Sequence, residues 1–141
     1  MAEEKEERVK IMTLDEANRA IPAVDANLKS LRALEREILS KQAQVDIEEM
    51  VGACRDGTLT AAGTRTRDEK LAEYNDLVRR FYAKFDEIEA LGGVLKDLKK
   101  GLVDFYAMRD GELVFLCWEE GEKNIAYWHS LENGYAGRQP L

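Results

Sequence analysis

The stretch that decides the fold is GLVDFYAMRDGELVFLCWEEGEKNIAYWHSLENGYAGR, residues 101–138. It contains three runs rich in apolar, aromatic and β-branched residues, the composition of β-strands: 102–107, 113–118 and 125–129. Asp110 and Gly111 separate the first two runs and supply the positive φ angles that a two-residue type I′ hairpin requires. A longer polar loop separates the second run from the third. The stretch therefore predicts a three-stranded antiparallel meander.

This turn also predicts a register for the hairpin. Pairing across it sets Asp104 opposite Cys117, and it sets Tyr106 opposite Phe115. The middle run, 113–118, is apolar on both faces, which is typical of a central strand covered on both sides. We expect one cover to be helical and the other to be a partner subunit.

The first helix is expected to open at a capping box, in which Thr13 and Glu16 bond each other's backbone N–H groups. Pro22 has no N–H to donate and clashes in a helix interior. We therefore predict a short helix over 14–20 and a kink or restart at Pro22. A long amphipathic helix then runs to a break at 54–58.

The second helix has the clearest periodicity in the chain. We expect it to begin near Thr66 or Arg67 and to end at Gly92 and Gly93 as a C-cap. Its apolar residues alternate three- and four-residue steps, which predicts a heptad seam: Leu71, Tyr74, Val78, Phe81, Phe85 and Ile88. Two such helices make an antiparallel hairpin. The apolar residues beside the seam either cover the sheet or pair with a second hairpin in a homodimer, and we favour both together.

Together these patterns predict an α+β fold in a single domain over residues 1–141. A long antiparallel helical hairpin over 13–92 packs on a small antiparallel β-meander, which the C-terminal third forms over 94–141. Residues 1–8 are expected to be a flexible leader, and 9–12 could add a short strand. The tail around Tyr135 is expected to be an ordered loop that folds back on the sheet.

Composition narrows the classes of function. The chain carries 28 acidic and 21 basic residues, a net charge of −7, which argues against nucleic acid and anionic membrane surfaces as partners. Two cysteines give no disulfide framework and fit a reducing cytosol. The N-terminus lacks the apolar segment of a signal peptide, and no apolar run approaches the ~18 residues of a membrane span. We expect a cytoplasmic protein.

Several motifs resemble a bacterial family catalogued as a domain of unknown function, DUF2203: GLVDF at 101–105, LCW at 116–118, YWH at 127–129 and GYAGRQPL at 134–141. The run LDEAN at 14–18 and Pro22 resemble the start of that family. The resemblance covers nearly the whole chain. It implies a cytosolic bacterial protein of helices plus a small sheet, and it implies no activity.

Cys117, His129 and Asp104 are the candidates for catalysis, as nucleophile, base and orienting carboxylate. The alternative is a buried cysteine acting as a small hydrophobe, a structural histidine and a turn-capping aspartate. No nucleophile elbow or cysteine-protease sequence surrounds Cys117, which favours the structural alternative. A zinc site would need Asp104, Glu122 or a second subunit, because the chain has one histidine and two distant cysteines. We expect no metal and no cofactor.

A ligand-binding surface is predicted from five residues near the C-terminus: Trp118, Trp128, His129, Tyr135 and Arg138. Aromatic rings and an arginine beside glycine-rich backbone could bind a small anion or a planar group. The alternative is that Trp128 and Tyr135 fill the core while Arg138 pairs with Asp104, Glu120 or Asp97.

The favoured hypothesis is a non-enzymatic interaction module, homodimeric through the hairpin, with an anion-binding or protein-binding surface on the sheet. The alternative is a small-molecule-binding protein or enzyme that uses Cys117, His129 and Arg138 in a pocket on the sheet. A shifted titration of His129 and a reactive Cys117 in the native state would favour the second hypothesis.

Overall fold

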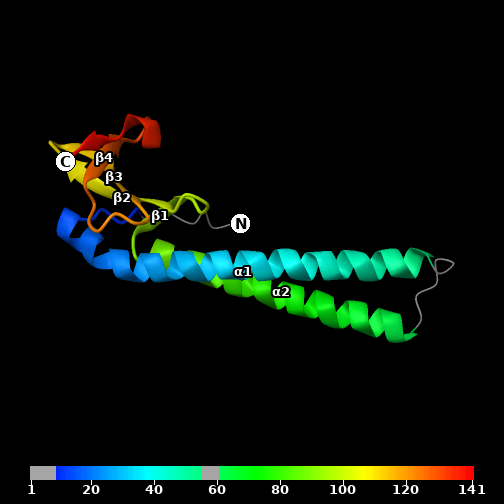
Figure 1. The fold of residues 1–141 in the computed structure, drawn as a ribbon. Helices are drawn as coiled ribbons and strands as arrows, with labels where there is room; N and C mark the ends of the chain where they lie inside the picture. The colour runs from blue at the N-terminus through cyan, green and yellow to red at the C-terminus, as the bar shows by residue number, and fades with distance from the viewer. Residues whose placement is uncertain (1–8, 55–60) are drawn as a thin grey trace, which may run out of the picture. The chain divides into compact units, whose positions relative to one another are not determined.

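The computed structural model describes residues 9–54 and 61–141. The elements, drawn in Figure 1, are α1 Leu14–Cys54, α2 Ala61–Ala90, β1 Gly93–Asp97, β2 Leu102–Arg109, β3 Glu112–Glu119, β4 Tyr127–Ser130, the 3₁₀ turn η1 Tyr135–Gly137 and β5 Gln139–Pro140. Two helices and a five-stranded antiparallel sheet confirm the predicted α+β class. The expected leader at residues 1–8 lies outside the described residues.

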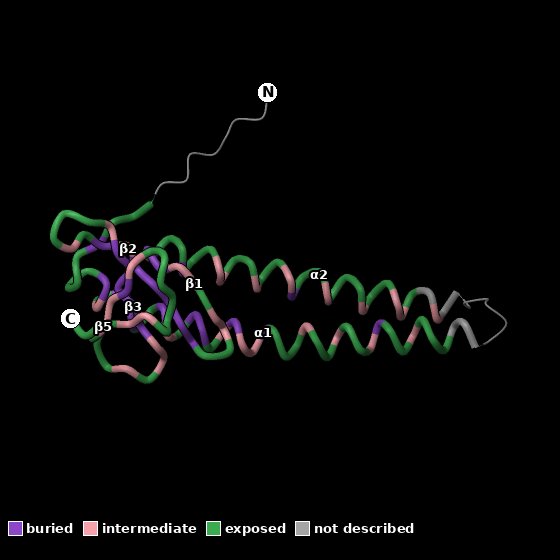
Figure 2. The backbone as a smooth tube through the Cα atoms, turned by 90° about the horizontal axis from the view of Figure 1, so that it is seen from above, coloured by how far each residue is buried: buried purple, intermediate pink, exposed green. Residues whose placement is uncertain are grey.

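The chain divides into two compact units. The sheet unit contains described residues 9–28 and 86–141, and the hairpin unit contains residues 29–85 apart from the undescribed 55–60. Figure 2 shows that the buried, purple segments concentrate in the sheet unit. The core that can position a functional site is therefore in the sheet unit.

The β2–β3 hairpin has the predicted turn and register. Asp110 has φ 51° and Gly111 has φ 81°, as a type I′ turn requires. Asp104 pairs with Cys117 across the ladder, and Tyr106 pairs with Phe115. The local turn chemistry was therefore sufficient to predict which residues of β2 and β3 meet.

The sheet is wider than the predicted meander, with strand order β1-β2-β3-β4-β5. β1 pairs with β2, and the two-residue β5 pairs with β4 through Gln139 and Pro140. Residues 9–12 form no strand, although the Met12 N–H donates to the Tyr106 carbonyl oxygen at 2.8 Å. The extra strands are short edge strands, which carry little hydrophobic periodicity of their own.

Alternation along the strands separates two faces of the sheet. The apolar face consists of buried side chains of β2 and β3: Val103, Phe105, Leu116 and Trp118. The first turns of α1, in the same unit, bury apolar residues at helical spacing: Ala17, Ile21, Val24 and Leu28. Asn18 Oδ1 accepts a hydrogen bond of 2.8 Å from the Ile125 N–H, which ties α1 to the segment before β4. Each large apolar side chain buried here stabilises the fold by about 1.5–3 kcal/mol.

The opposite face, here called the polar face, carries a different set on the same strands: Asp104, Phe115, Cys117, Tyr127 and His129. Asp104 and His129 are buried there, with 2% and 3% of their surface exposed. Burying an ionisable group is costly unless it is paired, so two such groups together are unusual in a protein core. The polar face is therefore where we place the candidate site.

α1 begins with the predicted capping box. The Glu16 N–H donates to Thr13 Oγ1 at 3.2 Å, and the Thr13 N–H donates to Glu16 Oε1 at 3.3 Å. The helix continues through Pro22 to Cys54, so it does not restart at the proline, and a kink there stays a prediction. It ends where the break was expected, and residues 55–60 lie outside the described part.

α2 begins at Ala61, earlier than the expected start near Thr66. The two alanines at its start have the highest helix propensity, and the glycine that follows costs only about 1 kcal/mol, so the helix tolerates it. The C-terminus is as predicted: Gly92 has φ 91°, and its N–H donates to the Glu89 carbonyl oxygen at 2.9 Å.

The predicted heptad seam is only partly correct. Among the residues of α2 whose burial the structure describes, Leu77 and Ile88 are the buried apolar ones, whereas Leu71 is 42% exposed. The remaining seam residues are half-buried: Tyr74, Val78, Phe81 and Phe85. A helix in a hairpin has one neighbouring helix, so part of a wide apolar stripe stays in contact with solvent.

Candidate functional site

His129 on β4 makes two contacts that define its protonation. Its Nδ1 lies 2.8 Å from the Ser130 carbonyl oxygen, and its Nε2 lies 2.9 Å from Asp104 Oδ2. A carbonyl oxygen only accepts hydrogen bonds, so Nδ1 carries a proton and donates it. Nε2 therefore faces the carboxyl group, and a single proton between Nε2 and Oδ2 completes that contact.

Cys117 lies beside this pair because of the strand register. β2 and β3 set Asp104 opposite Cys117, and β3 and β4 set Phe115 opposite His129. The imidazole thus reaches diagonally over the central strand to a carboxyl group two strands away. One ligand atom from each of Asp104, Cys117 and His129 lies within 4.8 Å of the others, and all three residues are buried. We call them the polar cluster.

Burial controls the electrostatics of the polar cluster. It raises the pKa of Asp104, and the charge of His129 opposes that rise. Burial and the nearby Asp104 carboxyl raise the pKa of the Cys117 thiol to about 12. A nucleophilic cysteine needs a lowered pKa, so the geometry does not supply an activated thiolate. The catalytic candidates do meet in space, but Asp104, not Cys117, is the residue that His129 contacts.

A pocket of about 400 Å³ opens over the polar cluster. Leu102, Phe115 and Tyr135 line it together with two lysines, Lys96 and Lys100. Lys96 Nζ lies 4.6 Å from the centroid of the Phe115 ring, and Lys100 Nζ lies 5.7 Å from that of Tyr135. Sequence reasoning did not select these lysines. Lys96 lies two residues after Val94, the β1 partner of Asp104, so a β1–β2 pairing would have placed it on the polar face.

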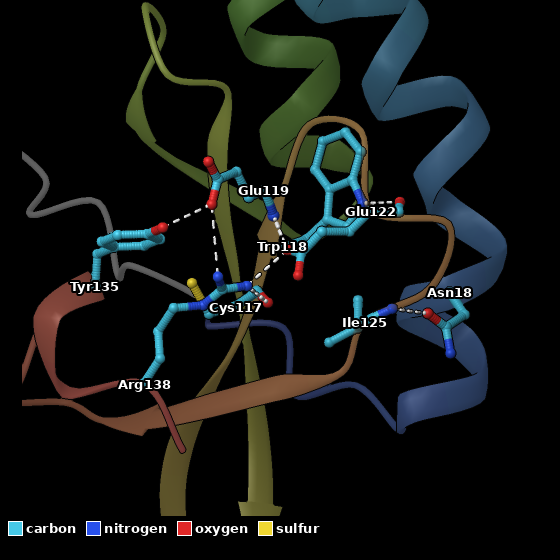
Figure 3. Close-up of polar contacts among 8 residues, drawn as sticks. All are labelled: Asn18, Cys117, Trp118, Glu119, Glu122, Ile125, Tyr135 and Arg138. Atoms are coloured by element: carbon cyan, nitrogen blue, oxygen red, sulfur yellow. Dashed lines mark hydrogen bonds and ion pairs between the residues drawn. The ribbon is translucent and has the colours of Figure 1, made fainter. Parts of the chain in front are cut away.

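Arg138 is held by side chains of the sheet unit (Figure 3). Its Nη2 donates to Glu122 Oε1 at 2.6 Å and to the Cys117 carbonyl oxygen at 3.3 Å, and Nη1 lies 3.5 Å from Glu119 Oε2. The guanidinium also lies 4.1 Å from the Tyr127 ring centroid. The acids that pair with Arg138 are therefore not the predicted Asp104, Glu120 or Asp97. Arg138 is not among the residues that line the pocket.

The other predicted ligand-binding residues are split between the two faces. Trp118 is buried on the apolar face, where its indole N–H donates to the Glu122 carbonyl oxygen at 2.9 Å. Trp128 adjoins His129 in the sequence and so points to the opposite face, where Arg109 lies 4.7 Å from its ring centroid. Tyr135 lines the pocket, and its hydroxyl donates to Glu119 Oε2 at 2.8 Å (Figure 3). The pocket therefore brings together His129 and Tyr135 of the five.

The residues of the polar cluster lie in the motifs GLVDF, LCW and YWH, which carried the resemblance in the sequence. A family model matches residues 10–141. The chain belongs to the DUF2203 family. That family is described as an uncharacterized conserved protein. The DUF2203 chain matches no curated protein and no solved structure.

Within residues 9–54 and 61–141, neither helix combines the length and the apolar character that crossing a membrane requires.

Proposed function

We propose that the sheet unit binds a small molecule carrying an anionic group, in the pocket over the polar cluster. The observation that carries the proposal is the cavity of about 400 Å³ with buried polar groups at its base. Ligand pockets typically have volumes of about 300–1,000 Å³, mostly apolar walls and a few convergent polar groups. The pocket over Asp104, Cys117 and His129 has a volume in this range, and it combines apolar side chains with converging polar groups.

Charge and ring contacts support an anionic group. Lys96 and Lys100 supply two ammonium groups at the pocket wall, and each lies against an aromatic ring that restrains it. Lysine binds carboxylate and phosphate as a point charge. The carboxylates of Asp97 and Glu132 also line the pocket, and Asp97 Oδ1 accepts the Lys100 backbone N–H at 2.9 Å, so the two lysines form the cationic part of a wall that also contains acids. Arg138 was the expected anion ligand; because it is paired with Glu119 and Glu122, the proposal places the anion at the lysines.

Thermal unfolding in inorganic phosphate and in acetate tests this proposal. An anion that binds only the folded protein stabilises it by about 2.7 kcal/mol at 100 times Kd. We expect phosphate or acetate to raise the Tm of the wild type more than that of the double variant Lys96→Ala/Lys100→Ala. Lys123→Ala, which removes an exposed lysine outside the pocket, is the matched control and should respond as the wild type does.

The double variant also corrects for the general stabilisation that phosphate gives to folded proteins. An equal rise in Tm for the wild type and the double variant would overturn the anion proposal, as would no rise at all.

For the hairpin unit we propose self-association as a homodimer. Leu39, Ile47 and Met50 are 61%, 57% and 66% exposed, and their spacing of eight and three residues puts them on one side of α1. The residues that α1 buries in this unit lie on the other side: Leu31, Leu34 and Val45. A stripe of exposed apolar side chains favours an interface.

Light scattering across a range of protein concentrations measures this association. The wild type should have the mass of a dimer, and Ile47→Lys/Met50→Lys should have that of a monomer. Asn75→Lys introduces the same type of charge at an exposed position of α2, outside the stripe, and should remain dimeric. A wild type that stays monomeric at every concentration, or a double variant that stays dimeric, would refute the proposal.

A further inference from the structure

We propose that Asp104, Cys117 and His129 bind a transition-metal ion of the Zn²⁺ class, with a coordination position open to the pocket. The inference deepens the small-molecule proposal, because an ion at the base of the pocket is itself a ligand for an anion. It rests on that proposed function only for the anion, since metal binding is measured with no anion added.

The first support is the ligand set. Zn²⁺ binds thiolate sulfur, imidazole nitrogen and carboxylate oxygen at about 2.0–2.3 Å in tetrahedral sites, which separates neighbouring ligand atoms by about 3–4 Å. The corresponding atoms of the polar cluster lie within 4.8 Å of one another, so side-chain shifts of about 1 Å would close the site. A thiolate and a carboxylate together supply two negative charges, which match a divalent cation.

The second support is the orientation of His129. Its Nδ1–H donates to the Ser130 carbonyl oxygen at 2.8 Å, which fixes the ring and directs Nε2 at Asp104. Metal-binding histidines commonly have this arrangement, in which one ring nitrogen binds the ion and the other donates to a carbonyl or carboxylate oxygen. Once the proton shared with Asp104 has left, the imidazole is in the tautomer that a metal at Nε2 requires.

The third support is an oxygen atom that lacks a partner. Asp104 is 2% exposed, and its Oδ1 is buried with no hydrogen bond of standard geometry to any described residue, although the Cys117 thiol, a weak donor, interacts with the same carboxyl group. Buried polar atoms are almost always hydrogen-bonded, and an exception in a folded protein calls for a ligand or another explanation. A cation between Asp104, Cys117 and His129 would bind this carboxylate.

The charges around the polar cluster permit a cation. Arg138, beside Cys117, is balanced by Glu119 and Glu122, and the cations Lys96 and Lys100 at the pocket wall are accompanied by the acids Asp97 and Glu132. Metal binding involves no oxidation or reduction: the ion forms bonds to sulfur, nitrogen and oxygen. It displaces the thiol proton of Cys117 and the proton held between Asp104 and His129, and both protons pass to solvent.

The ligand types select the class of metal. Mg²⁺ and Ca²⁺ take sites made of oxygen atoms, whereas a thiolate and an imidazole favour Zn²⁺ and its neighbours. Three protein ligands leave one tetrahedral position for water or an added ligand, and here that position faces the pocket that Lys96 and Lys100 line. A small anion bound there would contact both the ion and the lysines.

The test is a titration of the chelator-treated full chain with Co²⁺, followed by absorption spectroscopy. We expect a sulfur-to-cobalt charge-transfer band and the ligand-field bands of tetrahedral Co²⁺, both removed when Zn²⁺ is added. Cys117→Ser should lose the charge-transfer band. Asp104→Asn and His129→Ala should weaken Co²⁺ binding by more than about 100-fold, beyond the 10–100-fold that changes to outer-shell partners cause.

Two matched controls should bind Co²⁺ as the wild type does. Cys54→Ser removes the other cysteine of the chain, and Glu112→Gln removes an exposed carboxylate of β3 outside the polar cluster. If the charge-transfer band persists in Cys117→Ser and is lost in Cys54→Ser, the assignment is overturned.

The wild type alone keeps the proposal testable if a cluster variant does not fold. Absence of a charge-transfer band in the wild type overturns the metal site, and so does a rise in Tm with Mg²⁺ as large as the rise with Zn²⁺. A Co²⁺ band without any phosphate or acetate effect on Tm would support the metal site and refute the anion proposal. A rise in Tm with phosphate or acetate but no Co²⁺ band would support the anion proposal and refute the metal site.

Discussion

The imidazole of His129 on β4 lies 2.9 Å from a carboxyl oxygen of Asp104 on β2, across the central strand of the sheet. Both side chains are almost completely buried, and either one alone would be costly in the interior. The pair avoids most of that cost because one proton serves both groups and Nδ1 is satisfied by the Ser130 carbonyl oxygen. The contact joins β2 and β4, the two strands that flank β3.

This pairing predicts different effects for two substitutions of Asp104. In Asp104→Asn the amide can donate to the His129 Nε2 lone pair, so we expect a loss of less than about 1 kcal/mol in the free energy of unfolding. Asp104→Ala leaves Nε2 without a partner and should cost about 1–3 kcal/mol more than Asp104→Asn. Urea denaturation measures both losses, and equal losses would show that the hydrogen bond to His129 contributes little.

Cys117 should resist alkylation in the native protein. Burial raises the pKa of its thiol to about 12, and 1% of its surface is exposed. Little thiolate is present near pH 8, and a reagent cannot reach it, so its labelling should follow global unfolding. Mass mapping after a timed pulse of iodoacetamide distinguishes Cys117 from Cys54. Rapid labelling of Cys117 in the folded state would instead indicate an activated thiolate.

The same thiol predicts a loss of stability in alkali. The pKa of Cys117 is about 12 in the folded state against 9.0 for an unperturbed thiol, so above pH 9 the unfolded state loses its proton first. The stability that the protonated thiol contributes is therefore fully present below pH 9, and it is lost as the pH rises toward 12. The difference between the two pKa values corresponds to a loss of about 4 kcal/mol in the free energy of unfolding.

Measuring the free energy of unfolding between pH 9 and pH 12 in matched variants tests this pH dependence. Cys117→Ala should show a shallower decrease than the wild type, whereas Cys54→Ser should decrease as the wild type does. Parallel curves for the wild type and Cys117→Ala would contradict the prediction, whatever the absolute stability of each protein.

Arg138 should stabilise the sheet unit substantially, although it lies only a few residues from the C-terminal end of the sequence. Its side chain is 13% exposed and joins Glu122 to the Cys117 carbonyl oxygen. We expect Arg138→Ala to cost about 2–3 kcal/mol, somewhat less than the 3–5 kcal/mol of a fully buried pair. Arg138→Lys should recover less than half, because one ammonium group cannot reproduce the two-sided contact of the guanidinium.

Arg109→Ala is the control for Arg138, since it removes an arginine whose described contact is with the Trp128 ring. It should cost less than about 1 kcal/mol, as a partly exposed cation–π contact does. A similar small loss for Arg138→Ala in urea denaturation would show that the C-terminal segment does not stabilise the sheet.

The structural features that were predicted correctly are each determined by residues close together in the sequence. The turn at Asp110 and Gly111 sets the pairing of Asp104 with Cys117 because a two-residue hairpin allows one register. The capping box at Thr13 and the positive φ of Gly92 are likewise decided within a few residues. Local chemistry was enough for all three.

The features that the spacing of residues along the sequence could not establish depend on longer connections. The contact between His129 and Asp104 requires the register of β4, and the loop before β4 is too long for its length alone to set that register. The acids that hold Arg138 depend on how the C-terminal segment returns to β3. The candidate residues could thus be selected from their chemistry, but their grouping could not be derived from their spacing.

The buried side of α2 provides a last comparison within one helix. Leu77 is 7% exposed, whereas Leu71, a residue of the predicted heptad seam, is 42% exposed. Leu77→Ala should therefore destabilise the protein by about 2–4 kcal/mol, because it removes buried methyl groups and leaves a cavity. Leu71→Ala should cost less than about 1 kcal/mol, since leucine and alanine both favour helix and the substitution removes little buried surface. Chemical denaturation of the two variants decides between the heptad seam and the observed packing: a larger loss for Leu71→Ala would restore the seam that the periodicity predicted.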